Sequence, residues 1–121
     1  MNRLLGAWGE QIAVDHLLGL GWTIADRNWR CDAGELDIVA LEPLPGRPPC
    51  VVVVEVKAKA GTRYGPPLEA ITHRKLNRLR ALAVRWVREH PGVGLGLRLD
   101  AVGVLKSPGC APRLTHVRGA S

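Results

Sequence analysis

An acid and a base stand two residues apart at the end of a strongly apolar segment, where Glu55 and Lys57 follow the valine run Val51–Val54. Four consecutive valines predict a strand buried on both faces, because a half-exposed strand would alternate apolar with polar residues. Side chains two apart share one face of a strand, so Glu55 and Lys57 continue the face begun by Val51 and Val53. Ionised groups at the edge of a low-dielectric core are costly unless they are paired or bind a metal, and this placement therefore needs an explanation.

A second carboxylate, Asp37, has similar surroundings in the preceding expected strand. On that strand we expect Glu35, Asp37, Val39 and Leu41 on one face, and Leu36, Ile38 and Ala40 on the other. If the two strands pair, Asp37 approaches Glu55, with Lys57 beside them. Two close carboxylates repel unless a divalent cation lies between them, and oxygen ligands suit Mg²⁺ or Mn²⁺. Metal-assisted attack of water on a phosphodiester, with Lys57 orienting the nucleophile or stabilising charge on phosphorus, is a coherent chemistry for this set.

The simpler alternative is a lysine–carboxylate cluster on the solvent face of a sheet. Val51 and Val53 argue against it, because they lie on the same face as Glu55. Other chemistries have less support: no glycine-rich nucleotide loop follows a strand, and the four histidines lack metal-ligand spacing. Three cysteines without a Cys-x-x-Cys pair predict reduced thiols in a cytoplasmic protein.

Two helices and five strands are expected to position these residues. The expected order is α-β-β-β-α-β-β: helix 3–20, strands 22–30, 35–41 and 50–58, helix 68–90, and strands 95–105 and 113–118. The proline-rich segment Glu42–Pro49 is predicted to be a loop, and Gly61–Pro67 a second irregular segment just beyond Lys57. In the first helix Glu10 falls on the apolar side, so its carboxylate is expected to point toward the core. The simpler alternative is a glutamate at the edge of the apolar side whose carboxylate reaches solvent.

The whole chain, residues 1–121, is predicted to form one domain, with no apolar run of membrane length. Its net charge of +6 favours an anionic partner such as nucleic acid. Arginines on one side of the second helix form a stripe that could contact successive phosphates, although such a face is more often simply solvated. The expected nucleic-acid contacts are Arg63, Arg74, Lys75, Arg78, Arg85 and Arg88.

Several short motifs together resemble one bacterial family. They are Gly6-Ala-Trp-Gly-Glu10, Asn28-Trp-Arg-Cys31, Gly34-Glu-Leu-Asp-Ile-Val39, Val54-Glu-Val-Lys57, Tyr64-Gly65, Glu69-Ala-Ile71, Lys75, Arg98-Leu-Asp100 and His116. In this order and spacing they are similar to the YraN-like family, a group that resembles archaeal Holliday junction resolvases within the PD-(D/E)xK nuclease superfamily.

The resemblance implies a restriction-endonuclease-like fold, a mixed sheet flanked by helices. It also implies that Asp37, Glu55 and Lys57 are catalytic, that Glu10 is the additional helix-borne acid, and that Asp37, Glu55 and Glu10 hold the metal. Leu36 stands where the superfamily motif has proline. Since resolvases act on symmetric junctions in pairs, a homodimer is an implied arrangement.

The leading hypothesis is therefore a Mg²⁺- or Mn²⁺-dependent nuclease that acts on DNA, including branched DNA, with RNA as the alternative substrate. A second hypothesis is a catalytically silent nucleic-acid-binding or scaffold protein of the same fold, in which the arginines matter more than the carboxylates. A third is a protein-interaction domain that binds no nucleic acid. Fold alone does not decide among them.

Overall fold

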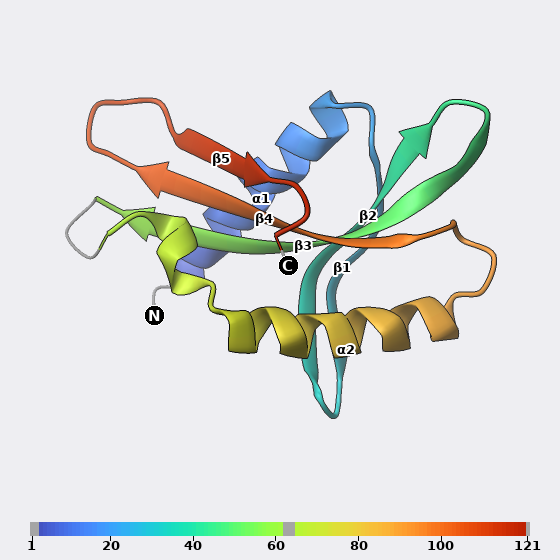
Figure 1. Ribbon diagram of the computed structural model, residues 1–121. Helices are drawn as coiled ribbons and strands as arrows, with labels where there is room; N and C mark the ends of the chain where they lie inside the picture. The colour runs from blue at the N-terminus through green and yellow to red at the C-terminus, as the bar shows by residue number, and fades with distance from the viewer. Residues whose placement is uncertain (1–2, 62–64, 121) are drawn as a thin grey trace.

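A computed structural model describes residues 3–61 and 65–120 and shows a five-stranded mixed sheet with one long helix on each face (Figure 1). The elements are α1 (Arg3–Gly19), β1 (Thr23–Cys31), β2 (Gly34–Leu44), β3 (Arg47–Ala60), the short 3₁₀ helix η1 (Pro67–Ala70), α2 (His73–Glu89), β4 (Leu97–Lys106) and β5 (Arg113–Val117). The α/β class and the predicted order of the two long helices and five strands are confirmed.

The strands lie side by side in chain order, β1-β2-β3-β4-β5. Strands β3 and β4 are parallel and all other neighbours are antiparallel. A parallel pair needs a long crossover, and η1 and α2 supply it between β3 and β4 (Figure 1). The crossover lays α2 over the sheet face opposite α1, so β3 is covered on both sides.

The valines of β3 contribute to both cores. Val52 and Val54 pack in the core beneath α1, with Ala13 and Leu17 of that helix. Val51 and Val53 pack in the core beneath α2, which also contains Trp86. All four valines are buried, so the predicted strand with two covered faces is confirmed.

The prediction of a loop over Glu42–Pro49 is wrong, because β2 and β3 continue through most of this segment as a hairpin. Leu44 pairs with Arg47 across a tight turn in which Gly46 has a φ of 70°. Pro48 and Pro49 are tolerated in β3 because neither has a register partner: pairing with β2 passes from Arg47 to Cys50, and pairing with β4 begins only at Val51.

The single long helix predicted from residue 68 is divided in two. Thr72 has extended backbone angles and its Oγ1 accepts a hydrogen bond from the Lys75 N–H, which starts α2 at His73. Before it, Pro66 and Pro67 begin η1. The predicted irregular segment between β3 and η1 lies partly outside the described residues.

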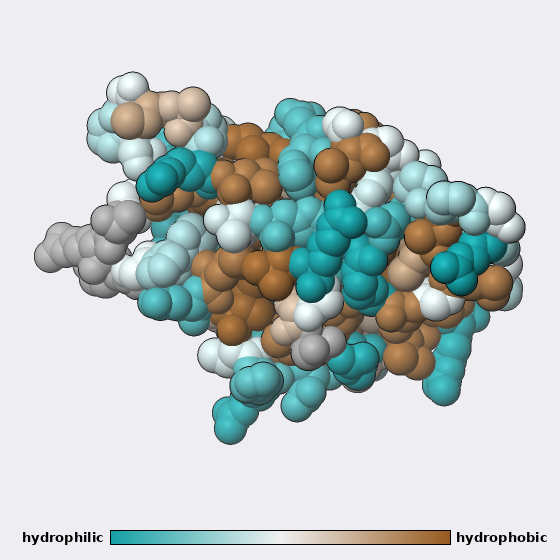
Figure 2. All heavy atoms as spheres, turned by 45° about the horizontal axis from the view of Figure 1, so that its top comes forward, coloured by the Kyte–Doolittle hydropathy of each residue, from teal (hydrophilic) through white to brown (hydrophobic). Residues whose placement is uncertain are grey.

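The surface shown in Figure 2 carries small apolar patches separated by polar side chains. The large apolar residues that are most exposed are Leu4, Leu18, Leu20, Leu95 and Val117. Among the described residues, neither long helix combines the length and apolar character that a membrane crossing requires.

Candidate active site

The site begins where β2 and β3 separate. Their ladder ends at the pair Ile38 and Val54, and the next backbone N–H of β3 that points toward β2 belongs to Val56. That N–H donates to Oδ2 of Asp37 at 2.9 Å. A side-chain carboxylate thus replaces a backbone carbonyl in the ladder, and the two strands diverge around it.

The predicted alternation of β2 fails at Asp37. Leu36 packs in the core beneath α2, as Val39 does, whereas Ile38 and Ala40 pack beneath α1. A regular strand would have placed Leu36 with Ile38 and Ala40. The irregularity at Asp37 turns its carboxyl toward the α1 side, and the prediction that Asp37 shares a face with Val39 is wrong.

The adjacent strand β1 is distorted at the same level. Asn28 has a φ of 51° and is the one non-glycine residue with positive φ among the described residues. Asparagine tolerates this left-handed conformation better than most residues. The distortion lets Arg27 and Asn28, which are consecutive, both reach Glu10 on α1.

The opening between β2 and β3 is lined from both faces of the sheet. On the α1 side a cavity of about 510 Å³ is bordered by Glu10, Asn28, Asp37, Glu55 and Lys57, together with Arg3 and Arg30. On the α2 side a smaller cavity of about 230 Å³ is bordered by Glu35, Glu55, Lys57, Lys75 and Arg78. Glu35, Glu55 and Lys57 border both cavities, so we call the two together the cleft.

Glu55 is a mostly buried carboxyl beside Asp37. Burial raises the pKa of Glu55 to about 9, and the hydrogen bond and negative charge of Asp37 act in the same direction. The cations of Lys57 and Lys75 lower that pKa, but by less. Around neutral pH the Asp37 and Glu55 pair therefore holds a proton on Glu55.

The donor chemistry of this pair fits a divalent cation. Two adjacent carboxyls that hold a proton between them at neutral pH would exchange it for Mg²⁺ or Mn²⁺, since the cation relieves the same repulsion. Within residues 3–61 and 65–120, however, no three His, Cys, Asp or Glu side chains converge in a way that could hold a metal. The pair is the part of the predicted ligand set that the fold brings together.

Glu10 faces the cleft, as predicted, but it is already paired. Its side chain is 13% exposed, and Oε1 accepts hydrogen bonds from Arg27 Nε and Asn28 Nδ2, both at 3.1 Å. A snorkelling glutamate would extend into solvent, and Glu10 does not. Whether it binds a metal stays a prediction, since its carboxylate is held here by β1.

The predicted nucleic-acid contacts differ in their surroundings. Lys75 and Arg78 border the cleft on its α2 side. Arg74 and Arg88 are exposed on α2. Arg85 is not a free cation, because it binds Asp32 at 2.6 Å and Glu89 at 3.1 Å. Arg63 lies outside the described residues.

Sequence reasoning missed the contribution of β1 to the site. Arg27 and Asn28 hold Glu10, and Arg30 borders the cavity on the α1 side. The signal that could have found them is Asn28 inside the predicted strand, because asparagine is depleted in regular strands and common where the chain bulges or turns into a left-handed conformation.

A second polar cluster surrounds Asp100, which is buried in β4. Arg98 donates to both oxygens of its carboxylate, His116 to Oδ2 at 2.8 Å, and the Gly119 N–H to Oδ1 at 3.0 Å. Burial alone would raise the pKa of Asp100, but the Arg98 and His116 bonds hold it below its usual value. His116 also contacts His16 of α1 at 3.0 Å. The cluster is fully satisfied and ties β5 to α1 and β4.

Comparison with known proteins identifies relatives along nearly the whole chain. A UPF0102 protein of Renibacterium salmoninarum is 49% identical over 115 residues, which cover 95% of this chain and 93% of the relative. A UPF0102 protein of Clavibacter michiganensis is 47% identical and one of Mycolicibacterium vanbaalenii 43% identical, each over at least 96% of this chain and 93% of the relative. The model of the family described as "Uncharacterised protein family UPF0102" matches residues 9–104, a span that contains Glu10, Asp37, Glu55 and Lys57. The chain therefore belongs to the UPF0102 (YraN) family, as its motifs predicted.

Proposed function

We propose that this protein is a Mg²⁺- or Mn²⁺-dependent nuclease with a restriction-endonuclease-like fold, which hydrolyses phosphodiester bonds in DNA. The observation that supports the proposal best is the Asp37 and Glu55 pair at the point where β2 leaves β3, with Lys57 on the same strand. The mixed sheet with a parallel β3–β4 pair and a helix on each face is compatible with that fold.

In this proposal the carboxyls and the cations of the cleft have separate roles. A bound divalent cation supplies Lewis acidity and lowers the pKa of a water nucleophile. Asp37 and Glu55 hold it, and Glu55 gives up its proton in doing so. Lys57 donates to the phosphate oxygens as negative charge develops on them, and Lys75 and Arg78 hold the flanking backbone from the α2 side.

The direct test is a cleavage assay on end-labelled duplex, single-stranded and four-way-junction DNA with Mg²⁺ or Mn²⁺. We expect the wild-type protein to cut at least one substrate, and Asp37→Asn and Lys57→Met each to lose at least a hundredfold in rate, in line with the loss of a charge-stabilising group. Asp15→Asn is the matched control, because Asp15 is exposed on α1 and bonds only Gln11 among the contacts described. A product that persists in Asp37→Asn would come from a contaminant and would count against the proposal.

A catalytically silent nucleic-acid-binding protein is the second candidate. It is favoured by the engagement of Glu10 with Arg27 and Asn28, which occupies one of the three predicted metal ligands. Here DNA binding without cleavage is expected, and binding should be unchanged in Asp37→Asn. Gel-shift titrations of both proteins across 50–300 mM salt separate this outcome from the nuclease.

A further inference from the structure

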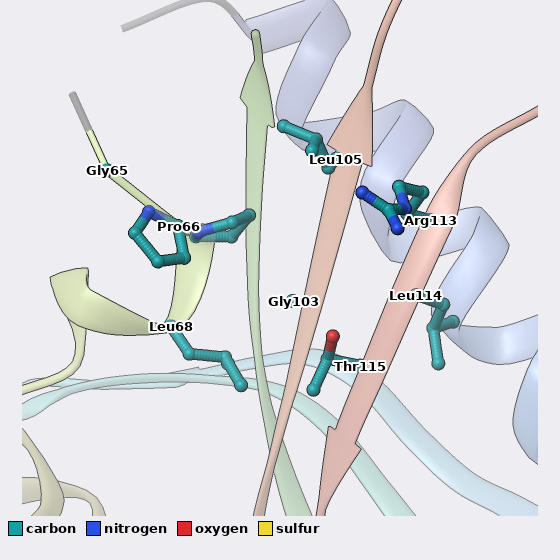
Figure 3. Close-up of a pocket in the computed structure, with 9 residues that line it drawn as sticks. Gly65, Pro66, Leu68, Gly103, Leu105, Arg113, Leu114 and Thr115 are labelled. Carbon is teal, nitrogen blue, oxygen red and sulfur yellow. The ribbon is translucent and has the colours of Figure 1, made fainter. Parts of the chain in front are cut away.

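A third cavity, of about 540 Å³, lies on the α2 side of the sheet, near its β5 edge (Figure 3). We call it the edge pocket. Its floor is β4 at Gly103, one wall is formed by Pro66, Pro67 and Leu68, and the other by Arg113 and Thr115 of β5. Figure 3 shows the Leu68 and Thr115 side chains directed toward each other from η1 and β5. The volume lies within the range of small-molecule sites.

Gly103 is needed for this arrangement. A Cβ at that position would lie 3.0 Å from Leu68 Cγ and 3.2 Å from Pro67 Cβ. These distances are shorter than ordinary van der Waals contacts, so a side chain at this position would require Leu68 and Pro67 to shift by a few tenths of an ångström. The missing side chain thus allows η1 to rest on β4 and to form one wall of the pocket.

The walls combine apolar surface with two unused polar groups. Proline and leucine side chains give flat apolar contacts, while the Arg113 guanidinium and the Thr115 hydroxyl make no hydrogen bond or ion pair to any residue in the described part of the chain. An apolar slot with a free guanidinium at its rim matches a planar ring that carries an anionic group, and a nucleotide has both parts.

The edge pocket lies on the same face of the sheet as the α2-side opening of the cleft. Gly103 pairs with Lys57 across the parallel β3–β4 ladder, and paired residues on neighbouring strands project to the same side. Lys57 borders the cleft and Gly103 lies at the bottom of the edge pocket, so the two cavities adjoin paired residues of neighbouring strands. A nucleic-acid strand whose phosphate reaches Lys57 would therefore place an adjacent nucleotide within reach of the pocket.

We infer that the edge pocket receives one unpaired nucleotide of the DNA strand that enters the cleft, with its base between the Pro66–Leu68 wall and β5 and its phosphate on Arg113. This inference rests on the proposed function and adds to it a preference for DNA with an unpaired or extruded base. A paired base is held in its stack and must be unpaired at a cost before it can enter such a pocket, whereas an unpaired base enters at little cost.

The test measures binding in the absence of cleavage, in buffer with EDTA. Two otherwise identical duplexes are compared, one fully paired and one with a single unpaired 2-aminopurine. We expect the wild-type protein to bind the second about tenfold more tightly, because the first must be unpaired at a cost before a base can enter the pocket. We also expect binding to change the 2-aminopurine fluorescence. Thr115→Trp fills the pocket, and tryptophan suits an exposed strand position. We expect it to abolish both the preference and the fluorescence change.

Arg113→Gln should lower affinity for the duplex with the unpaired base more than for the paired duplex. Arg47→Gln is the matched control. It removes the same charge, but Arg47 is exposed at the distant turn between β2 and β3. Equal affinity of the wild-type protein for both duplexes, or a preference that survives in Thr115→Trp, would overturn the inference while leaving the cleavage assay unaffected. A preference without any cleavage would instead retain the pocket and reject the nuclease.

Discussion

Asp37 Oδ2 accepts a hydrogen bond from the Val56 N–H at 2.9 Å, so one carboxylate oxygen is bound to the backbone of the neighbouring strand. This bond takes the place of the backbone ladder where β2 leaves β3, and it holds Asp37 near Glu55, whose pKa Asp37 helps to raise. The separation of β2 from β3 and the proximity of two acids thus have a single local cause. A carboxylate anchored in this way moves little when a cation arrives, which favours binding.

Glu55→Gln should stabilise the metal-free protein at alkaline pH. The pKa of Glu55 is about 9 in the folded protein, against an ordinary value of 4.5, so the folded state binds the extra proton between these values. The associated stability is complete below pH 4.5 and is lost as pH rises through 9. We expect Glu55→Gln to raise the free energy of unfolding by on the order of 3 kcal/mol at pH 8 and by little at pH 4.5.

Urea denaturation at pH 5, 7 and 8 with EDTA measures this difference. Asp15→Asn, which removes an exposed acid from α1, should follow the wild-type pH dependence. Parallel pH profiles for Glu55→Gln and the wild-type protein would show that Glu55 ionises normally in the folded state.

Binding of Mn²⁺ should strengthen as pH rises. Because Glu55 holds a proton near neutral pH, a cation that binds the pair must release it. We expect the dissociation constant for Mn²⁺ to fall about tenfold per pH unit between pH 6 and 8. Calorimetry in two buffers of different ionisation heat would count about one proton released. Asp37→Asn keeps an oxygen that can accept the Val56 N–H but loses the charge, so this variant should bind Mn²⁺ poorly. A dissociation constant that does not change with pH would mean that Mn²⁺ binds away from the Asp37 and Glu55 pair.

Much of the fold follows from local pattern. The valine run predicted a strand with both faces covered, and Val52 and Val54 meet α1 while Val51 and Val53 meet α2. The hairpin at residues 42–49 could not be predicted by the same reasoning. Prolines exclude a strand only where their missing N–H is needed, and the absence of a β4 partner at Pro48 is a tertiary fact.

The site was predictable in its composition but not in its geometry. The spacing of Glu55 and Lys57 and the acid in the preceding strand predicted that Asp37, Glu55 and Lys57 would lie close together, and all three border the cleft on its α1 side. Strict alternation then assigned Asp37 to the wrong face, because a side chain that replaces a backbone acceptor breaks the period of two. The pairing of Glu10 with Arg27 and Asn28 depends on the left-handed backbone at Asn28, which periodicity does not encode.

Asp100→Asn should destabilise the fold strongly. Arg98, His116 and the Gly119 N–H all donate to this buried carboxylate, so removing its charge breaks a buried ion pair. We expect a loss of about 3 kcal/mol in the free energy of unfolding, measured in urea at pH 7. Asp32→Asn is the control, since it breaks an ion pair with Arg85 that is exposed, and its effect should be much smaller. Equal effects would mean that the buried cluster contributes no more than a surface pair.

Two arginines of α2, Arg78 and Arg88, should contribute more to DNA binding than Arg85 does. Arg78 borders the cleft and Arg88 lies ten residues further along α2, about 15 Å away by helical rise, and both are exposed. Each should release about one counterion, so Arg78→Gln and Arg88→Gln should each reduce the slope of log affinity against log salt by about 0.9.

Arg85 projects from the same helix but is bound by Asp32 and Glu89. A phosphate would have to displace two carboxylates that already neutralise it, so Arg85→Gln should change the slope less than either neighbour does. Anisotropy titrations of the three variants on one duplex across 50–300 mM salt compare them directly. If Arg85→Gln reduces the slope as much as Arg78→Gln, the ion pairs of Arg85 open when DNA binds and α2 acts as a continuous basic stripe. If Arg88→Gln leaves the slope unchanged, the DNA contacts only the cleft end of α2.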